Sequence, residues 1–299
     1  MMFSVKRRIE AGCYTVMRSA SKNLTAIIQF VSAVLYRMFL FVIRRKSPRL
    51  IIYYHSVKGQ YQARFEKQME YLARNCNVVK AYEIMRPKAG KRPVVAITFD
   101  DAFVNVMENA IPVLKKFSLP ASIFVPTGNL GQPPHWYLEA GDTSGNETVM
   151  NERQILELDK NGFEILSHTV SHPFLVKLDD GELNAEMIGS RQTLENIVGH
   201  AIVGISYPYG EFDTRVCEAA KKAGYIFGFT AEPLVIEDRV DNFRIGRFRV
   251  SERDSLPIFR LKVNGAYQVM NHLSFIKKYV IKILNRIVPM PGTGRTEVA

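Results

Sequence analysis

The chain has 299 residues and a formal net charge of +11, with 47% hydrophobic and 23% charged residues. This length fits one large α/β domain, excludes a second full domain, and comes with a composition too ordinary for extended disorder. So basic a chain suits a nucleic acid or an anionic membrane surface, and no zinc-finger or ribonucleoprotein motif supports a nucleic-acid partner.

The excess positive charge lies at the N-terminus. Residues 1–49 hold ten Lys and Arg residues against a single acid, Glu10. The cations flank an apolar run at 24–43, long enough to span a bilayer but interrupted by Arg37, which is costly inside a membrane. This run is expected either to span the membrane or to lie on its surface, and it lacks the cleavage site of a signal peptide. Three widely spaced cysteines favour a reducing compartment, so we expect a membrane-associated protein on the cytoplasmic face.

From residue 50 onward, short β-rich runs alternate with helical patterns. Such repeated units predict parallel strands covered by helices, either as a barrel or as a sheet with helices on both faces. In both arrangements, site residues gather at the carboxyl ends of the strands. The predicted strands are 50–56, 94–99, 121–126, 163–168, 203–209, 226–232 and 243–250, and the helices between them are 63–75, 106–117, 151–162, 180–199 and 213–225.

Two of these strands end in residues that bind metals. The strand 94–99 is followed by Asp100 and Asp101, and the strand 163–168 ends in His168, four residues before His172. Neighbouring carboxylates point in different directions, so one can bind an ion while the other faces a water molecule. Two imidazoles four apart share one face of a helical turn, and a ligand set of one Asp and two His leaves coordination positions open, as catalytic sites do. The pattern therefore predicts a catalytic metal site.

Three motifs follow one another along the chain: TFDDA (98–102), HTVSH (168–172) and SYPYG (206–210). With them the chain resembles the polysaccharide deacetylase family, carbohydrate esterase family four, whose first motifs read TFDDG, H(S/T)xxH and RxPYG. The resemblance covers roughly residues 50–255 and implies an α/β fold, a distorted barrel of seven β/α units. It also implies Asp100 as general base, Asp101, His168 and His172 as metal ligands, and the backbone N–H of Tyr209 in the oxyanion hole.

The chain departs from the family pattern at two functional positions. Ser206 replaces the Arg that positions the catalytic Asp in the family. Arg244, Arg247 or Arg249 of the last strand could supply that guanidinium, and Arg247 is our choice. The late Leu-x-His motif, which carries the general acid, is also missing. His55 can replace it because the first and last strands of a closed barrel are neighbours, as in a rearranged branch of the family with an early YH motif.

Two further segments are assigned from their composition. The stretch 128–149 is rich in Gly, Pro and polar residues and is expected to form a loop over the site, where Trp136 would contact the sugar together with Pro208. Near the C-terminus, residues 274–288 form a basic amphipathic pattern that either binds a membrane surface or packs on the barrel. The predicted division is a membrane-associating segment at 1–49, a deacetylase barrel at 50–255 and a C-terminal helix and tail at 256–299.

Together the metal-site pattern and the family resemblance imply a metal-dependent hydrolase that removes the N-acetyl group of an amino sugar in a bacterial polysaccharide or lipid-linked glycan. We expect it at the cytoplasmic face of a bacterial inner membrane. Zinc is the expected ion because of the two imidazoles, although cobalt, nickel or iron fits the same ligands. Two alternatives stay open at this point. The enzyme could remove a formyl or other acyl group from a lipid-linked sugar, or the barrel could bind glycan without catalysis.

Overall fold

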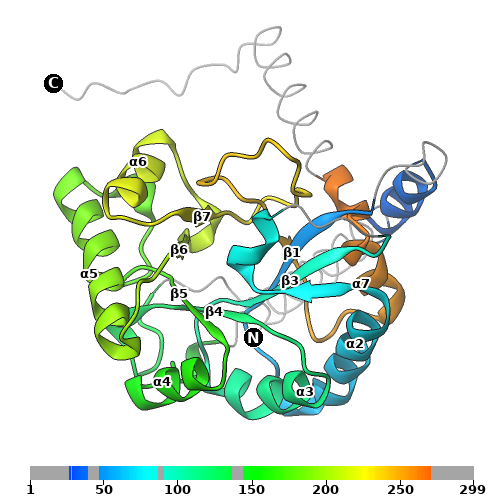
Figure 1. Cartoon of the computed structure of the whole chain (residues 1–299), viewed down its shortest axis with the longest axis horizontal. Helices are drawn as coiled ribbons and strands as arrows, with labels where there is room; N and C mark the ends of the chain where they lie inside the picture. Colours follow the sequence, from blue (N-terminus) through cyan, green and yellow to red (C-terminus); the bar gives the residue numbers. More distant parts are fainter. Residues whose placement is uncertain (1–26, 28, 40–46, 87–90, 137–143, 271–299) are drawn as a thin grey trace, which may run out of the picture.

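The computed structural model describes residues 27, 29–39, 47–86, 91–136 and 144–270. Within these ranges the strands form one parallel sheet in the order β7-β6-β5-β4-β3-β1-β8, with β2 paired to β3 (Figure 1). The strands are β1 (Arg49–Tyr54), β2 (Asn77–Val79), β3 (Val94–Phe99), β4 (Ser122–Val125), β5 (Glu164–Ser167), β6 (Gly204–Ser206), β7 (Phe227–Phe229) and β8 (Phe248–Arg249).

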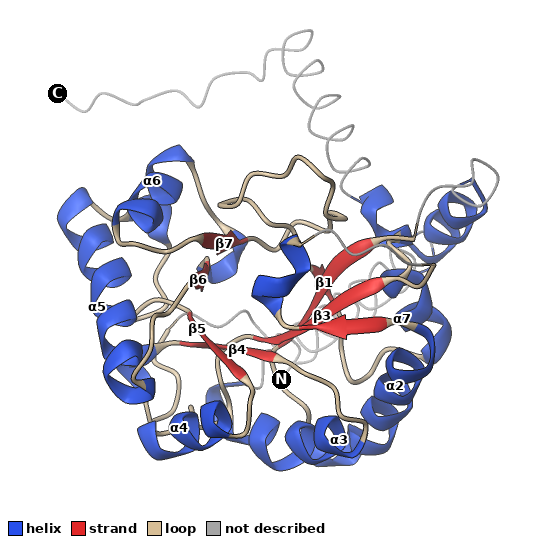
Figure 2. Cartoon of the chain, viewed as in Figure 1, coloured by secondary structure: helices blue, strands red, loops and turns tan. Residues whose placement is uncertain are grey.

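Helices surround the strands on the outside of the sheet (Figure 2). Local capping fixes where they begin: the side chain of Asn151 accepts a hydrogen bond from the N–H of Gln154, and Asp179 caps the next helix in the same way. Gly199 ends that helix in the left-handed conformation. The helices are α2 (Gln62–Asn75), α3 (Ile111–Lys116), α4 (Glu152–Lys160), α5 (Asp180–Val198), α6 (Thr214–Lys222) and α7 (Leu256–Val263).

Residues 242–250 bring the two ends of the sheet together. Ile245 forms a parallel bridge with Phe229 of β7. Further along the same segment, β8 pairs with β1, and the N–H of Val250 donates to the carbonyl of Tyr53 over 3.0 Å. This closure confirms the predicted α/β architecture, a distorted barrel in which the first strand neighbours the last.

Both faces of the sheet are buried, as parallel strands with helices outside require. Along β1, Leu50 and Ile52 join the large core between the sheet and the helices, whereas Ile51 belongs to the smaller core inside the barrel. Since side chains alternate along a strand, Tyr53 also points inward, toward the end of the barrel where the strands finish.

The structure adds two elements to those predicted. Strand β2 has only three residues, too few to give a periodic pattern in the sequence. Helix α7 packs against α2, where the rings of Phe259 and Tyr71 lie 6.3 Å apart, so the packed body continues past residue 255. The predicted amphipathic helix at 274–288 lies outside the described residues. Within the apolar run, 29–39 are helical, and no helix in the described ranges is long and apolar enough to cross a membrane.

Candidate active site

Asp100 and Asp101 lie directly after β3, at the end of the barrel where a site is expected. The N–H of Asp100 donates to the carbonyl of Tyr54 over 2.8 Å, which extends the pairing of β3 with β1 by one residue. Asp101 and Ala102 then adopt left-handed backbone conformations, with φ of 66° and 46°. This turn separates the directions of the two carboxylates, and both are buried, with exposed fractions of 3% and 4%.

The carboxylate of Asp101 meets two imidazoles. Its Oδ1 lies 3.7 Å from Nε2 of His168 and 3.6 Å from Nε2 of His172. One ligand atom from each residue lies within 4.8 Å of the others. Nδ1 of His168 lies 2.9 Å from the carbonyl of Ser206, which holds the proton on Nδ1 and leaves the lone pair of Nε2 available to a metal ion. This donor set fits a divalent transition-metal ion.

Burial also favours the metal-binding form of the two histidines. It lowers the pKa of His168, against the opposing charge of Asp100, and it lowers the pKa of His172 well below the usual range with help from His168. Both rings are therefore neutral near pH 7, and neutral imidazole is the form that binds metals.

The loop that presents the histidines is not the helical turn expected from their spacing. Thr169 and His172 have positive φ values, 67° and 56°, so the loop is irregular. Glu186 of α5 holds it by accepting hydrogen bonds from the N–H groups of Val170 (2.8 Å) and Ser171 (2.9 Å). A tertiary contact thus brings the two rings to a centroid distance of 4.7 Å.

Asp100 is held by Arg247, which the sequence offered as one of three candidate arginines. Nη1 and Nη2 of Arg247 donate to Oδ1 and Oδ2 of Asp100 over 2.7 and 2.9 Å. Its remaining donors reach the Oγ of Ser206 (2.6 Å) and the carbonyl of Thr230 (3.0 Å). Ser206 therefore accepts from the arginine that takes over the position of the family's motif Arg. Burial would raise the pKa of Asp100, but Arg247 and His168 outweigh it and lower the pKa to about 2.

His55 lies one residue after β1 and lines the same cavity as Asp100. Its ring centroid is 5.6 Å from that of Tyr53. Burial lowers the pKa of His55 to about 4, although Asp100 acts in the opposite direction. The imidazole is therefore neutral near pH 7 and gives up any added proton readily.

Tyr209 sits in a strained turn beside the metal-ligand cluster. It has φ of 59°, a conformation that a bulky residue rarely adopts without tertiary support. Support comes from Phe174, whose ring stacks on that of Tyr209 at a centroid distance of 4.0 Å, and from an edge contact with His172. Gly210 follows with φ of 71°, and a Cβ there would lie 2.5 Å from that of Ala231, so the close approach requires glycine.

The cavity at this site has a volume of about 180 Å³. Trp136 closes one side, stacked on His172 at a centroid distance of 4.8 Å. Pro208, predicted to bind substrate, is buried and is not among the residues that line the cavity. The lining also includes Tyr53, Tyr207 and Ala231, which the sequence did not mark as site residues; alternation along β1 could have indicated Tyr53. The lining residues are Tyr53, His55, Asp100, Asp101, Trp136, His168, His172, Tyr207, Tyr209, Gly210, Ala231, Arg247 and Arg249.

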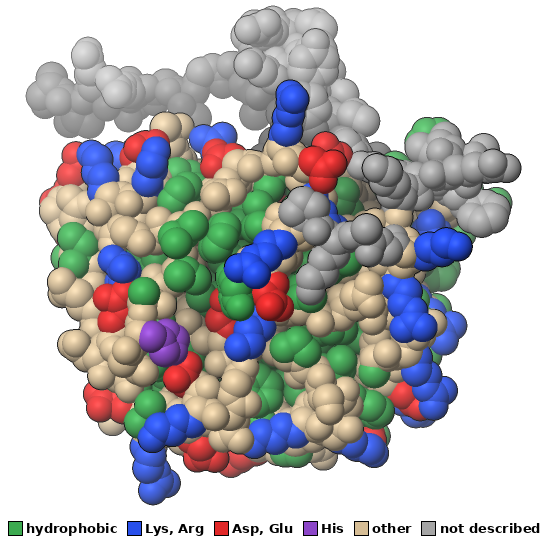
Figure 3. All heavy atoms as spheres, in the orientation of Figure 1, with side chains coloured by type: hydrophobic (Ala, Val, Ile, Leu, Met, Phe, Trp, Pro, Cys, Tyr) green, Lys and Arg blue, Asp and Glu red, His purple; other side chains and the backbone are tan. Residues whose placement is uncertain are grey.

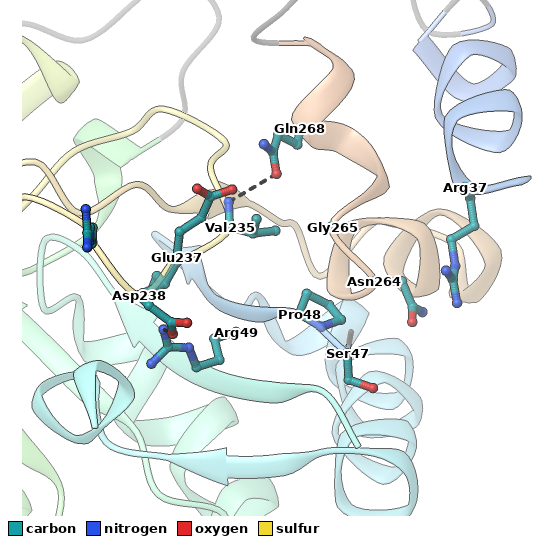
Figure 4. Close-up of a pocket in the computed structure, with 12 residues that line it drawn as sticks. Arg37, Ser47, Pro48, Arg49, Val235, Glu237, Asp238, Asn264, Gly265 and Gln268 are labelled. Atoms are coloured by element: carbon teal, nitrogen blue, oxygen red, sulfur yellow. Dashed lines mark hydrogen bonds and ion pairs between the residues drawn. The ribbon is translucent and has the colours of Figure 1, made fainter. Parts of the chain in front are cut away.

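A second cavity lies at the opposite end of β1. It measures about 530 Å³, and Figure 4 shows Arg37, Arg49 and Asp238 among its lining residues. Arg49 and Asp238 form an ion pair of 2.8 Å within it. None of its lining residues is a histidine, and it lies away from the metal-ligand cluster. The smaller cavity is therefore the candidate active site, despite its size.

Comparisons with known proteins agree with this geometry. A family profile described as "Polysaccharide deacetylase" matches residues 87–228. YxkH of Bacillus subtilis (strain 168), a protein named as a polysaccharide deacetylase, is 30% identical over 216 residues, covering 67% of this chain and 71% of YxkH. The poly-beta-1,6-N-acetyl-D-glucosamine N-deacetylase of Staphylococcus aureus is 26% identical over 204 residues, covering 64% of this chain and 67% of that protein.

Solved structures share this fold, among them one that matches over nearly its whole length. The deacetylase PplD of Streptococcus pyogenes, solved in complex with acetate, superposes with a TM-score of 0.61. The match covers 73% of this chain and 99% of PplD. At 21% identity this likeness bears on the fold alone.

Proposed function

The chain belongs to the polysaccharide deacetylase family, and we propose that it hydrolyses the N-acetyl amide of an amino sugar in a glycan, releasing acetate. The observation that carries the proposal is one cavity that holds Asp101, His168 and His172 beside Asp100. The name of the Staphylococcus aureus relative supports an N-acetylglucosamine unit within the substrate class. A carboxylate base next to a metal-ligand cluster is the arrangement that metal-assisted amide hydrolysis needs.

We propose zinc as the ion, with cobalt, nickel or iron as substitutes, because two imidazoles and a carboxylate suit these metals. When bound, the ion would polarise the amide carbonyl and lower the pKa of a water molecule. Asp100 would accept the proton of the attacking water. Arg247 would keep Asp100 ionised and fix its direction through the two hydrogen bonds described above. The N–H of Tyr209 would donate to the oxyanion, a contribution of about 3 kcal/mol for such a donor.

The leaving nitrogen must gain a proton as the amide bond breaks. We propose that His55 delivers it, because its ring lines the cavity beside Asp100. With a pKa of about 4, His55 is neutral near pH 7, so the proton that it delivers would be the one that Asp100 took from the water. The protonated ring would then pass this proton to the amine, which is far more basic. The amine then leaves the cavity as the free amino sugar.

Removal of divalent ions should abolish this activity. We expect purified protein to release acetate from an N-acetylglucosamine oligomer, to slow by at least about 100-fold after treatment with a chelator, and to recover with zinc. Acetate and formate would be measured in the same samples, together with bound metal. Formate without acetate would replace the proposal with the deformylase alternative. Binding of the oligomer without release of either acid would support the non-catalytic barrel.

We further propose that residues 27–39 attach the enzyme to a membrane surface. Apolar side chains at four-residue spacing are exposed here: Ile27 (59%), Val31 (48%), Leu35 (61%) and Phe39 (56%). Ala33, on the other side of this helix, is fully buried. Cations in the sequence flank the helix, whereas acidic and basic side chains are interspersed over the face of the body in Figure 3. An apolar stripe with cations beside it fits an anionic lipid surface.

Two glutamates on the stripe should weaken this attachment. The double variant Leu35→Glu, Phe39→Glu is expected to bind vesicles of anionic phospholipid about tenfold more weakly or worse, since it buries less apolar area and adds negative charge. Co-sedimentation with anionic and with zwitterionic vesicles would measure the effect. Ile226→Glu is the matched control, because Ile226 is 51% exposed and lies on a different element. Equal binding by wild type and the double variant would exclude this surface, and a shift in oligomeric state instead would assign the stripe to a second copy.

A further inference from the structure

Arg249 is a second arginine on the inner side of residues 243–250. Phe248 and Val250, which flank it, are buried in the core beneath the helices, with exposed fractions of 1% and 3%. Alternation along the strand therefore directs Arg249 to the same side as Arg247. Its pairing with Tyr53 of β1 places it one step nearer the cavity mouth than Arg247, and its side chain lines the cavity.

The two arginines differ in how their charges are balanced. Arg247 is 1% exposed and makes a two-pronged ion pair with Asp100. Arg249 is exposed, and over the described ranges no ion pair joins it to a carboxylate. The acid that follows it along the chain, Glu252, pairs with Arg253 at 3.6 Å. Among the described residues, no acid pairs with this guanidinium at the mouth of the active site.

The two acids that line the cavity do not pair with Arg249. Asp100 and Asp101 are the only acids among the described lining residues. Asp100 is engaged by Arg247, and Asp101 faces the two imidazoles. A divalent ion would add further positive charge. Since neither acid of the described lining pairs with Arg249, an anionic group of the substrate is its electrostatic complement.

We infer that Arg249 is a specificity-determining residue, which binds a carboxylate or phosphate carried by the glycan next to the N-acetylated sugar. The inference rests on the proposed function and narrows its substrate to an acidic glycan. A guanidinium matches both anions through two parallel N–H donors, whereas a neutral sugar offers it only hydroxyl oxygens. Charge-assisted contacts of this kind change affinity by about 10- to 100-fold.

Three oligosaccharides of equal length test the inference. The first is a neutral N-acetylglucosamine oligomer. The second alternates N-acetylhexosamine with uronic acid and so carries carboxylates, and the third is an N-acetylglucosamine oligomer that ends in a sugar phosphate. For wild type we expect kcat/KM at least about tenfold higher with one of the acidic substrates. In Arg249→Gln this preference should fall about tenfold or more, chiefly through KM, and Arg249→Lys should restore part of it. The substrate that responds identifies carboxylate or phosphate as the ligand.

Arg244→Gln is the matched control, because Arg244 is exposed on the same segment and pairs with Asp241 at 3.5 Å. It should keep the wild-type preference. An equal rate with all three substrates, or an unchanged preference in Arg249→Gln, would overturn the inference while leaving deacetylation intact. If no substrate yields acetate, the proposed function fails instead, and calorimetric binding of the same oligomers to wild type and Arg249→Gln still decides whether Arg249 binds the anion.

Discussion

Asn in place of Asp100 is expected to lower acetate release by at least about 1000-fold while the protein keeps its bound metal. The side chain of Asp100 is separate from the cluster of Asp101, His168 and His172, so this substitution removes the base and spares the ligands. Asn has nearly the same shape and can still accept one hydrogen bond from Arg247, but it cannot take a proton from water. Acetate release under single-turnover conditions and metal content per chain would be measured together.

Two comparisons make the Asp100 result specific. His55→Ala should also keep its metal and lose at least about tenfold in turnover, a smaller loss than Asp100→Asn because water can partly replace the acid. Asp101→Asn should lose metal and activity together, because Asp101 supplies the one carboxylate among the three ligand residues. If Asp100→Asn turned over at the wild-type rate, Asp100 would not be the base. Loss of its metal would instead make Asp100 part of the ligand set.

Replacement of Arg247 by Met is expected to destabilise the protein and to shift its pH dependence. The substitution leaves the buried carboxylate of Asp100 without its partner, a change that costs about 3 to 5 kcal/mol in unfolding free energy. Burial acts to raise the pKa of Asp100, and Arg247 is the main group that lowers it to about 2. Without Arg247 the pKa rises, so the acid limb of the rate profile should move to higher pH.

The direction of the pH effect on stability follows from the same shift. The pKa of Asp100 is lowered on folding, so its contribution to stability is complete above the unfolded value, about 3.9, and is lost as the pH falls toward 2. Wild type should therefore lose stability over this acid window, and Arg247→Met should lack that component. Denaturant unfolding at several pH values, with rate profiles, would measure both effects.

Two control variants separate the effect on the pKa of Asp100 from a general loss of folding. Arg247→Lys keeps the charge but not the paired donors, so it should fold and retain more of the depressed pKa than the Met variant. Arg244→Met lies on the same segment and is exposed, so it should leave the profile unchanged. An acid limb that stays at the wild-type position in both Arg247 variants would show that Arg247 does not set the ionisation of Asp100.

The local sequence was sufficient to predict the main strands and the end of the sheet at which the site lies. The runs at 94–99 and 163–168 are apolar and bounded by polar residues, so β3 and β5 were predicted within one residue at each end. Because parallel strands end at one side of a sheet, the positions of Asp100 and His168 in the sequence also predicted that they would share a site. Short elements gave no such signal: β2 has three residues, and its place beside β3 depends on long-range pairing.

Tertiary structure decided the details that chemistry depends on. The sequence left three arginines as partners for Asp100, and only the register of β8 against β1 places Arg247 at the carboxylate and Arg249 at the mouth. Spacing predicted a helical turn for the histidines, but Glu186, distant in sequence, holds an irregular loop instead. The sequence therefore determined that the two carboxylates and the two imidazoles lie at the same end of the strands, because the limits of each strand are set by local sequence. Their orientation and charge balance came from contacts between distant segments, which no local pattern encodes.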